Sequence, residues 1–353
     1  MKKRTVQIVL TVIFSIAALY IAFRGINFAD VRRALSQVRW VWIALTFGLI
    51  LVTLVIRAER WRILLGRTLS LRDTFGLINI GYLISGVLPL RAGDPARAVG
   101  ASLRGDVSAL AALSTVIVER VLDLLMVILI LVGTLPLVPG LRAYLAAGEV
   151  GGFFSYRVIL ILSGILAFGI LLALVLIAVF PAVTEALGRW LLAKVGVKNP
   201  DRWLAPLHHI LEGLDALRSF QDGGLVLLWS IMLWVVTAIY FITGLQASRA
   251  FLPEPTALKG VVAMWASAFG MIFPATGGIG SFHFAVREAL FWGFDLPRDL
   301  GFAYAVLIHA LPYLTGIVLG ALALITWGLS VKRLIDTQPQ AETYPSEQHP
   351  SET

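Results

Sequence analysis

The stretch GVLPLRAGDPAR, residues 86–97, decides the fold, because it places two prolines and three charged residues directly after an apolar run. A proline carries no amide hydrogen and breaks a helix, so neighbouring backbone groups lose their intrahelical partners. Lipid cannot satisfy such groups, and a break of this kind within a membrane must be buried in protein or line a wet cavity. In a membrane protein, this stretch therefore predicts an interrupted helix beside a polar site.

The composition of the chain indicates that its solvent is lipid. Of 353 residues, 58% are hydrophobic and only 14% are charged, and the mean hydropathy is +0.86. A soluble domain of this length could not bury so much apolar surface, so we expect an integral membrane protein. The net charge of +8 then indicates contact with an anionic membrane surface rather than nucleic-acid binding. The absence of cysteine excludes disulfides and thiolate metal sites.

Six apolar runs are long enough to cross a bilayer, which takes about 20 residues per helix. They are residues 6–23, 40–56, 110–131, 158–180, 225–245 and 301–329. The polar connection 185–222 contains tryptophan and leucine among its charges, which suits an amphipathic helix at the interface. We expect one transmembrane domain over 1–335 and a disordered cytoplasmic tail over 336–353. The distribution of Lys and Arg favours cytoplasmic termini.

A second interrupted segment resembles the first. AFGMIFPATGGIGSFHFAV, residues 268–286, aligns with LISGVLPLRAGDPARAV, residues 83–99, so that Pro274 falls on Pro89 and Gly278 on Gly93. Matching interruptions in two halves are typical of an inverted repeat with a binding site at its centre. The predicted turn residues are Pro89, Gly93, Pro274, Gly277, Gly278 and Gly280.

These patterns predict an all-α polytopic membrane protein with about six spanning helices and two re-entrant helical hairpins. The predicted repeat halves are residues 6–131 and 158–329. Each hairpin would start its second half-helix near the middle of the membrane, where the free amides attract an anion. Two ordinary kinked spanning helices are the alternative to the hairpins.

Charged residues also lie within the spanning run 110–131. Glu119 and Asp123 are four residues apart and share a helix face, and Arg120 lies beside them. Charges at this depth cost several kcal/mol unless they are paired or hydrated, so they indicate a functional site. The alternative is a structural ion-pair network, for example between Arg120 and Asp94. After the second turn, His283 and Arg287 share a face in the same way, although a lone histidine often only holds helices together.

Several other features suggest structure or exclude a class of chemistry. RAERWRILLGR, residues 57–67, is interpreted as a basic, tryptophan-containing helix end whose side chains snorkel to the interface. The sequence contains no Walker loop, no HExxH motif and no zinc-ligand spacing. We therefore expect no metal, no cofactor and no enzymatic activity.

Four motifs occur in order along the chain: RAERWRILL at 57–65, N-x9-P-x-R-A-G-D-x-x-R at 79–97, ERVLDLL at 119–125 and P-x-x-G-G-I-G at 274–280. Together they resemble the lysylphosphatidylglycerol synthase transmembrane (flippase-like) family, over residues 6–331. The resemblance implies a polytopic inner-membrane protein that moves lipids with anionic or modified head groups between leaflets.

The chain departs from the family pattern in two places. The acidic residue after RAG is commonly Glu and is Asp94 here, and His283 stands where a Glu is expected soon after GGIG. No soluble aminoacyl-transfer domain accompanies these motifs, so we do not expect lipid aminoacylation.

Position and chemistry assign two sets of site residues. Guanidinium groups match phosphate oxygens in a bidentate way, which favours Arg91, Arg97, Arg120 and Arg287 as ligands of a lipid phosphate or head group. Charge compensation or proton relay is assigned to Asp94, Glu119, Asp123 and His283.

The expected function is a membrane lipid translocase for anionic, head-group-modified or polyprenyl-phosphate-linked lipids. The alternatives are a secondary transporter of a small soluble anion and a polyprenyl-phosphate-dependent membrane glycosyltransferase. Expected partners are a membrane phospholipid or glycolipid, a second copy in a homodimer and a separate lipid-modifying enzyme, with no nucleic acid. The expected location is the cytoplasmic (inner) membrane of a bacterium or archaeon.

Overall fold

The computed structural model describes residues 2–88, 92–146, 156–194, 196–197, 204, 219–252, 254–273 and 275–336. Three predicted site or turn residues, Pro89, Arg91 and Pro274, lie outside these ranges, as do the tail from residue 337 and most of the predicted interfacial segment after residue 194. The described part of the chain is helical and contains no strand.

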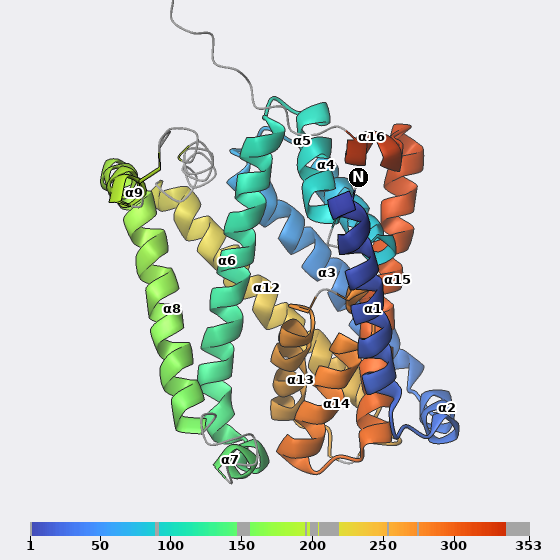
Figure 1. The fold of residues 1–353 in the computed structure, drawn as a ribbon. Coiled ribbons are helices and arrows are strands. Elements are labelled where there is room, and N and C mark those ends of the chain that lie inside the picture. The colour runs from blue at the N-terminus through green and yellow to red at the C-terminus, as the bar shows by residue number, and fades with distance from the viewer. Residues whose placement is uncertain are drawn as a thin grey trace, which may run out of the picture.

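All six predicted apolar runs form helices (Figure 1). They are α1 (Lys2–Phe23), α3 (Trp40–Leu64), α6 (Ala109–Thr134), α8 (Tyr156–Val179), α12 (Phe220–Ala247) and α15 (Arg298–Trp327). Within the described residues, α3, α12 and α15 are each long and apolar enough to cross a membrane. Two further spans are obtained if α1 and α6 are each counted together with the short helix that follows at a sharp bend, and α8 contributes a shorter apolar helix over 157–173. An all-α multi-pass membrane protein is therefore confirmed.

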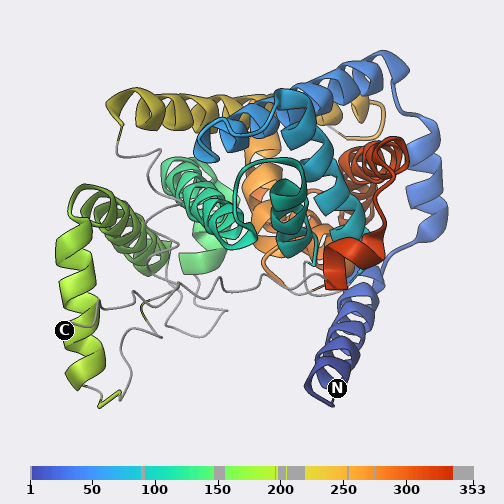
Figure 2. The same cartoon turned by 90° about the horizontal axis from the view of Figure 1, so that it is seen from above.

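Short helices lie at the ends of the long ones. α2 (Phe28–Ser36) turns by 79° from α1, and α7 (Pro139–Ala146) turns by 93° from α6 after the 3-10 turn η1 (Leu135–Leu137). α9 (Pro181–Lys194) follows α8, and α16 (Val331–Asp336) follows α15. Figure 2 shows α3 and α12 side by side along one edge, with α8 and α9 at the far side of α6.

Serine and threonine residues fix where several helices begin. The side chains of Ser70, Ser108, Ser219 and Thr256 each accept a hydrogen bond from the backbone N–H three residues later. A free amide at a helix start needs such a partner where water is scarce. These caps define the starts of α4 (Leu71–Val87), α6, α12 and α13 (Ala257–Gly270).

The first interrupted segment is a helical hairpin made of α4 and α5 (Gly93–Arg104). At its base, Arg104 pairs with Asp73 at 2.6 Å. At its tip, the backbone N–H of Gly93 donates to Ser85 Oγ at 3.2 Å. A side chain at Gly93 would collide with the carbonyl oxygen of Gly81, so the close approach of the two halves requires glycine there.

The second interrupted segment is also a hairpin, made of α13, the 3-10 turn η3 (Thr276–Gly278) and α14 (Ser281–Phe294). Its turn places Gly277, Gly278 and Gly280 at φ of 58°, 71° and 94°, in the left-handed region that favours glycine. The two hairpins enter from opposite ends of the protein (Figure 1). In each segment the second helix packs back on the first, α5 on α4 and α14 on α13, as the hairpin prediction requires.

The tips of the two hairpins meet at Tyr313 of α15. The Tyr313 hydroxyl donates to the carbonyl oxygen of Gly86 at the end of α4, at 2.9 Å. The same ring lies against Gly277 of the second turn. Tyr313 thus satisfies a carbonyl at the end of α4, which lipid could not do, and packs against the second turn.

Candidate functional site

Four arginines and three carboxylates gather beside the tip of the first hairpin. They come from α3, α5 and α6, helices that are separate in the sequence and packed together in the fold. The cluster consists of Arg57, Arg60, Asp94, Arg97, Glu119, Arg120 and Asp123. Four positive and three negative charges leave an excess of one positive charge, since 4 − 3 = 1.

The centre of this cluster is Glu119 of α6. Its Oε1 accepts from Arg60 Nη2 at 3.0 Å, and its Oε2 accepts from Arg97 Nη2 at 2.6 Å. The side chains of Arg60 and Glu119 are 0% and 1% exposed. A carboxylate can be buried at this depth because each of its oxygens receives a charged hydrogen bond.

Asp123, one turn further along α6, continues the network toward α12. Its Oδ1 accepts from Arg60 Nη1 at 2.8 Å and its Oδ2 from Arg57 Nη1 at 3.2 Å. Arg60 Nη1 also donates to Ser230 Oγ of α12 at 3.2 Å. Because Glu119 and Asp123 share a helix face, a single arginine spans both, and α3, α6 and α12 are held together.

Asp94 of α5 pairs with Arg120 of α6 at the outer side of the cluster. Arg120 Nη2 donates to Oδ1 at 2.7 Å and Arg120 Nε donates to Oδ2 at 3.2 Å. The side chains are 42% and 22% exposed for Arg120 and Asp94, unlike the buried pair at Glu119. This part of the cluster is therefore accessible from outside the protein.

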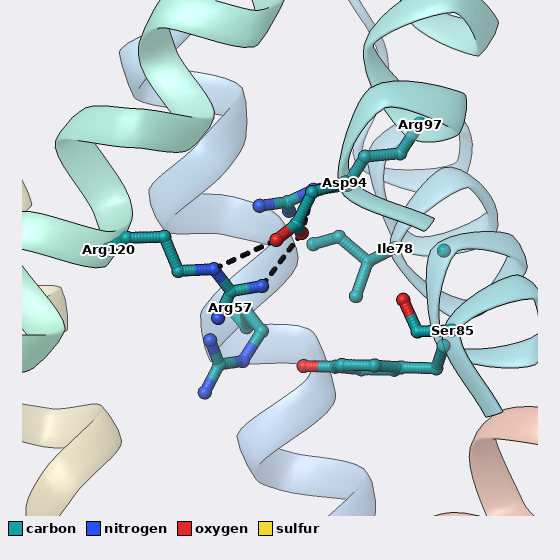
Figure 3. A pocket seen from close by; sticks show the side chains of 8 residues that line it. Arg57, Ile78, Ser85, Asp94, Arg97 and Arg120 are labelled. Carbon is teal, nitrogen blue, oxygen red and sulfur yellow. Dashed lines mark hydrogen bonds and ion pairs between the residues drawn. The ribbon is translucent and has the colours of Figure 1, made fainter. Parts of the chain in front are cut away.

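A small pocket opens next to the Asp94–Arg120 pair (Figure 3). Figure 3 shows Arg57 and Arg120 reaching into it from one side, with Ser85 on the other. Its lining residues are Arg57, Ile78, Gly81, Tyr82, Ser85, Asp94, Arg97 and Arg120. The cavity volume is about 20 Å³, which is room for about one water molecule. Arginine side chains, a tyrosine and a serine thus face a space that must widen to admit a larger group.

Sequence reasoning missed Arg57 and Arg60, and the interpretation of 57–67 as a snorkelling helix end is wrong for both. The side chains of Arg57 and Arg60 are 20% and 0% exposed and pair with carboxylates of α6 instead of reaching outward. Trp61 is buried as well, and its Nε1 donates to Thr115 Oγ1 at 3.0 Å. The signal that could have found them is residue spacing. Arg57 and Arg60 lie three residues apart on one helix face and can pair with Glu119 and Asp123, which lie four residues apart on another.

The second hairpin carries its polar residues elsewhere. His283 is buried, and its Nδ1 accepts from the backbone N–H of Gly280 at 3.3 Å, which caps α14. Its ring lies 4.9 Å from that of His309. The structure therefore places His283 in a capping and packing position and not among the charges around Glu119.

Arg287, predicted as a ligand of a lipid phosphate or head group, lies outside the cluster around Glu119. Arg287 Nη1 donates to the carbonyl oxygen of Ala22 at 2.6 Å and to that of Arg24 at 3.3 Å. A cation at the end of a helix satisfies the last carbonyls and the helix dipole. Glu288 accepts from Arg287 Nε and from Arg298, each at 2.9 Å. These residues tie α14 to α1 and α15.

Among the described residues, no group of three or more His, Asp and Glu side chains is placed to hold a metal ion. Of the predicted phosphate ligands, Arg97 and Arg120 line the pocket and Arg91 lies outside the described residues. Of the predicted compensating residues, Asp94, Glu119 and Asp123 pair with arginines of the cluster.

The sequence model of the family described as the lysylphosphatidylglycerol synthase TM region matches residues 8–320. Neither the curated proteins nor the solved structures gave a match to the chain.

Proposed function

The chain belongs to the lysylphosphatidylglycerol synthase TM-region family, and from this membership and the arginine cluster we propose that it moves lipids with anionic head groups between the leaflets of a membrane. The observation that carries the proposal is the excess positive charge beside the tip of the first hairpin, where three arginines, Arg57, Arg97 and Arg120, line a pocket that is open to the outside.

The electrostatics support an anionic ligand. A buried arginine is costly unless an anion balances it, and the cluster has one more arginine than carboxylates. A phosphodiester carries one negative charge and offers two oxygens to a guanidinium fork. In our proposal Arg57 and Arg120 bind that phosphate while the hydrocarbon chains stay in the surrounding lipid.

The division of the cluster into a buried and an exposed part supports a carrier role. Arg60, Arg97 and Glu119 are buried and hold α3, α5 and α6 in place. The pair of Asp94 and Arg120 is partly exposed. A site that must bind and release a head group requires such accessible charges on a rigid frame.

Further parts of the proposal concern the cellular setting. We propose a binding and transport function without catalysis of a covalent step, in the inner membrane of a bacterium or archaeon. The start of α1 and the short helix α16 lie at the same end of the molecule (Figure 1), which we assign to the cytoplasm. A separate lipid-modifying enzyme would supply the head group.

Leaflet exchange in proteoliposomes tests the proposal. Fluorescent phosphatidylglycerol, phosphatidylcholine and polyprenyl phosphate are compared for the wild type, Arg57→Gln and Arg120→Gln. Loss of one charge-assisted hydrogen bond costs about 1.5–3 kcal/mol, so we expect each variant to exchange the anionic lipid about 10- to 150-fold more slowly. The matched control is Arg104→Gln, an arginine of the same hairpin that pairs with Asp73 away from the pocket.

Exchange of no lipid by a folded, inserted wild type would overturn the proposal. If all three lipids were exchanged, at the same rates in the wild type and in both variants, the protein would be disturbing the bilayer and not recognising a head group. Uptake of radioactive phosphate into the same vesicles, without lipid exchange, would favour a transporter of a soluble anion.

A further inference from the structure

The guanidinium group of Arg120 already binds a carboxylate of the protein itself. Two parallel N–H···O contacts, at 2.7 and 3.2 Å, join the two Asp94 oxygens to Nη2 and Nε of Arg120. This bidentate geometry is the one in which arginine also holds a phosphate. Asp94 therefore occupies the place on Arg120 that the proposed function gives to a lipid phosphate.

The pocket beside this pair is too small for a phosphate while Asp94 stays. Its volume is about 20 Å³, enough for about one water molecule. The deeper ion pairs cannot open to enlarge it, since removing a partner from the buried Arg60–Glu119 pair leaves an uncompensated charge in the interior. Arg120 and Asp94 are partly exposed, so this pair is the one that can separate.

A second partner for Asp94 lies close by. Arg97 Nε is buried and has no hydrogen-bond partner within the described structure, and it lies 3.5 Å from Asp94 Oδ1. A movement of less than about 1 Å would bring this contact to ordinary hydrogen-bond length. Arg97 is held in place by Glu119, at 2.6 Å, and by the Trp61 ring, 4.7 Å from the guanidinium carbon. Its Nε is thus a fixed donor that Asp94 can reach.

We infer that Asp94 is a built-in competitor for the phosphate site, with two stable positions, one on Arg120 and one on Arg97 Nε. An arriving phosphate takes the Arg120 fork, and Asp94 moves to Arg97; when the phosphate leaves, Asp94 returns. Charge on Arg120 is balanced at every stage, so neither binding nor release leaves a bare cation within the membrane. This inference rests on the proposed function for the identity of the anion as a lipid phosphate.

Competition makes a definite prediction for affinity. A neutral side chain at position 94 cannot compete, so Asp94→Asn should bind an anion more tightly and release it more slowly. We expect the dissociation constant for dihexanoyl-phosphatidylglycerol to fall about tenfold and the rate of leaflet exchange to fall with it. Asp94→Ser, which is too short to reach Arg120, should behave in the same way.

The experiment is calorimetric titration of the purified, detergent-solubilised full chain with dihexanoyl-phosphatidylglycerol. Dihexanoylglycerol, which has no phosphate, should bind equally to all variants. The matched control is Asp73→Asn, which removes a carboxylate from the same hairpin at the Arg104 pair outside the pocket, and its affinity for the anionic lipid should equal that of the wild type. Inorganic phosphate is titrated in parallel. If the position-94 variants bind only the lipid more tightly, Asp94 competes with a lipid phosphate. If they bind both the lipid and inorganic phosphate more tightly, Asp94 competes at a site that also admits free phosphate.

The inference would be overturned if both folded position-94 variants bound the anionic lipid as tightly as the wild type or more weakly. That result would mean that the Asp94 carboxylate orients Arg120 for binding and does not compete with the ligand. Thermal unfolding of each variant establishes that it is folded. The binding result is independent of transport. If Asp94→Asn binds the anionic lipid more tightly but the wild type exchanges no lipid, the inference about Asp94 stands and the proposed translocase function is overturned.

Discussion

The hairpins α4–α5 and α13–α14 have the same shape and enter from opposite ends, but their charged residues lie in different places. In the first, Asp94 and Arg97 stand at the tip and join charges of α3 and α6. In the second, the tip is a turn of left-handed glycines, and the charges of Arg287 and Glu288 bind helix ends and Arg298. A shared backbone geometry therefore does not imply a shared chemistry.

This difference indicates that the neighbours of a hairpin decide its chemistry. The first hairpin faces Glu119 on α6, so Arg97 can be kept buried near its tip. The second faces Ala22 and Arg24 carbonyls of α1 and the ring of His309. We expect that lipid recognition depends on the first hairpin and that the second mainly positions it.

The largest effect should come from Glu119→Gln. The change leaves Arg60 and Arg97 without a full counter-charge inside the protein, and breaking a buried pair costs about 3–5 kcal/mol. Glu288→Gln in the second hairpin should cost less, because the partner Arg298 is partly exposed. Thermal unfolding in detergent micelles measures both. Equal losses of stability in the two variants would contradict the contrast between the charges beside the first hairpin and those of the second.

The next effect concerns the turn of the second hairpin. Gly280→Ala places a methyl group on a residue with φ of 94° and against the backbone of Ala18 and Leu19 in α1, and such strain costs about 1–3 kcal/mol. Gly133→Ala in α6, where nothing lies within 4 Å of the added carbon, is the matched control and should not destabilise. The melting temperatures of the two variants provide the test, and a stable Gly280→Ala would contradict the role of the left-handed turn.

A smaller effect is expected where the two tips meet. Tyr313→Phe removes the hydrogen bond to the Gly86 carbonyl but keeps the ring against Gly277, and a single hydrogen bond contributes about 1 kcal/mol. Leaflet exchange should change together with stability if the contact couples the hairpins. A variant that loses stability but exchanges lipid at the wild-type rate would show that the tips need not stay joined.

The smallest effect is expected at the base of the first hairpin. Asp73→Asn breaks the partly exposed pair with Arg104, and pairs of this kind contribute about 0–1 kcal/mol. The melting temperature should therefore stay close to that of the wild type. A loss of stability as large as that of Glu119→Gln would mean that burial of a carboxylate does not set the cost of removing its charge.

Much of the fold could be predicted from local patterns. Six apolar runs, two breaks at proline and glycine, and the left-handed turn at 277–280 are each a property of a short segment. The candidate site was predicted in part: Glu119 and Asp123 were recognisable because charges inside an apolar helix need partners, and the pairing of Arg120 with Asp94 is confirmed.

The sequence by itself determined that this chain lies in lipid, that two of its helices are interrupted and that arginines and carboxylates must pair within the membrane. Hydropathy and backbone hydrogen bonding act over a few residues, so they can be read locally. Only the tertiary structure decided which charges pair. Arg60 meets Glu119 across 59 positions of sequence, while His283 and Arg287, equally suggestive by type, serve helix ends. The partner of a buried charge depends on which helix faces it, and that is set by packing of the whole chain.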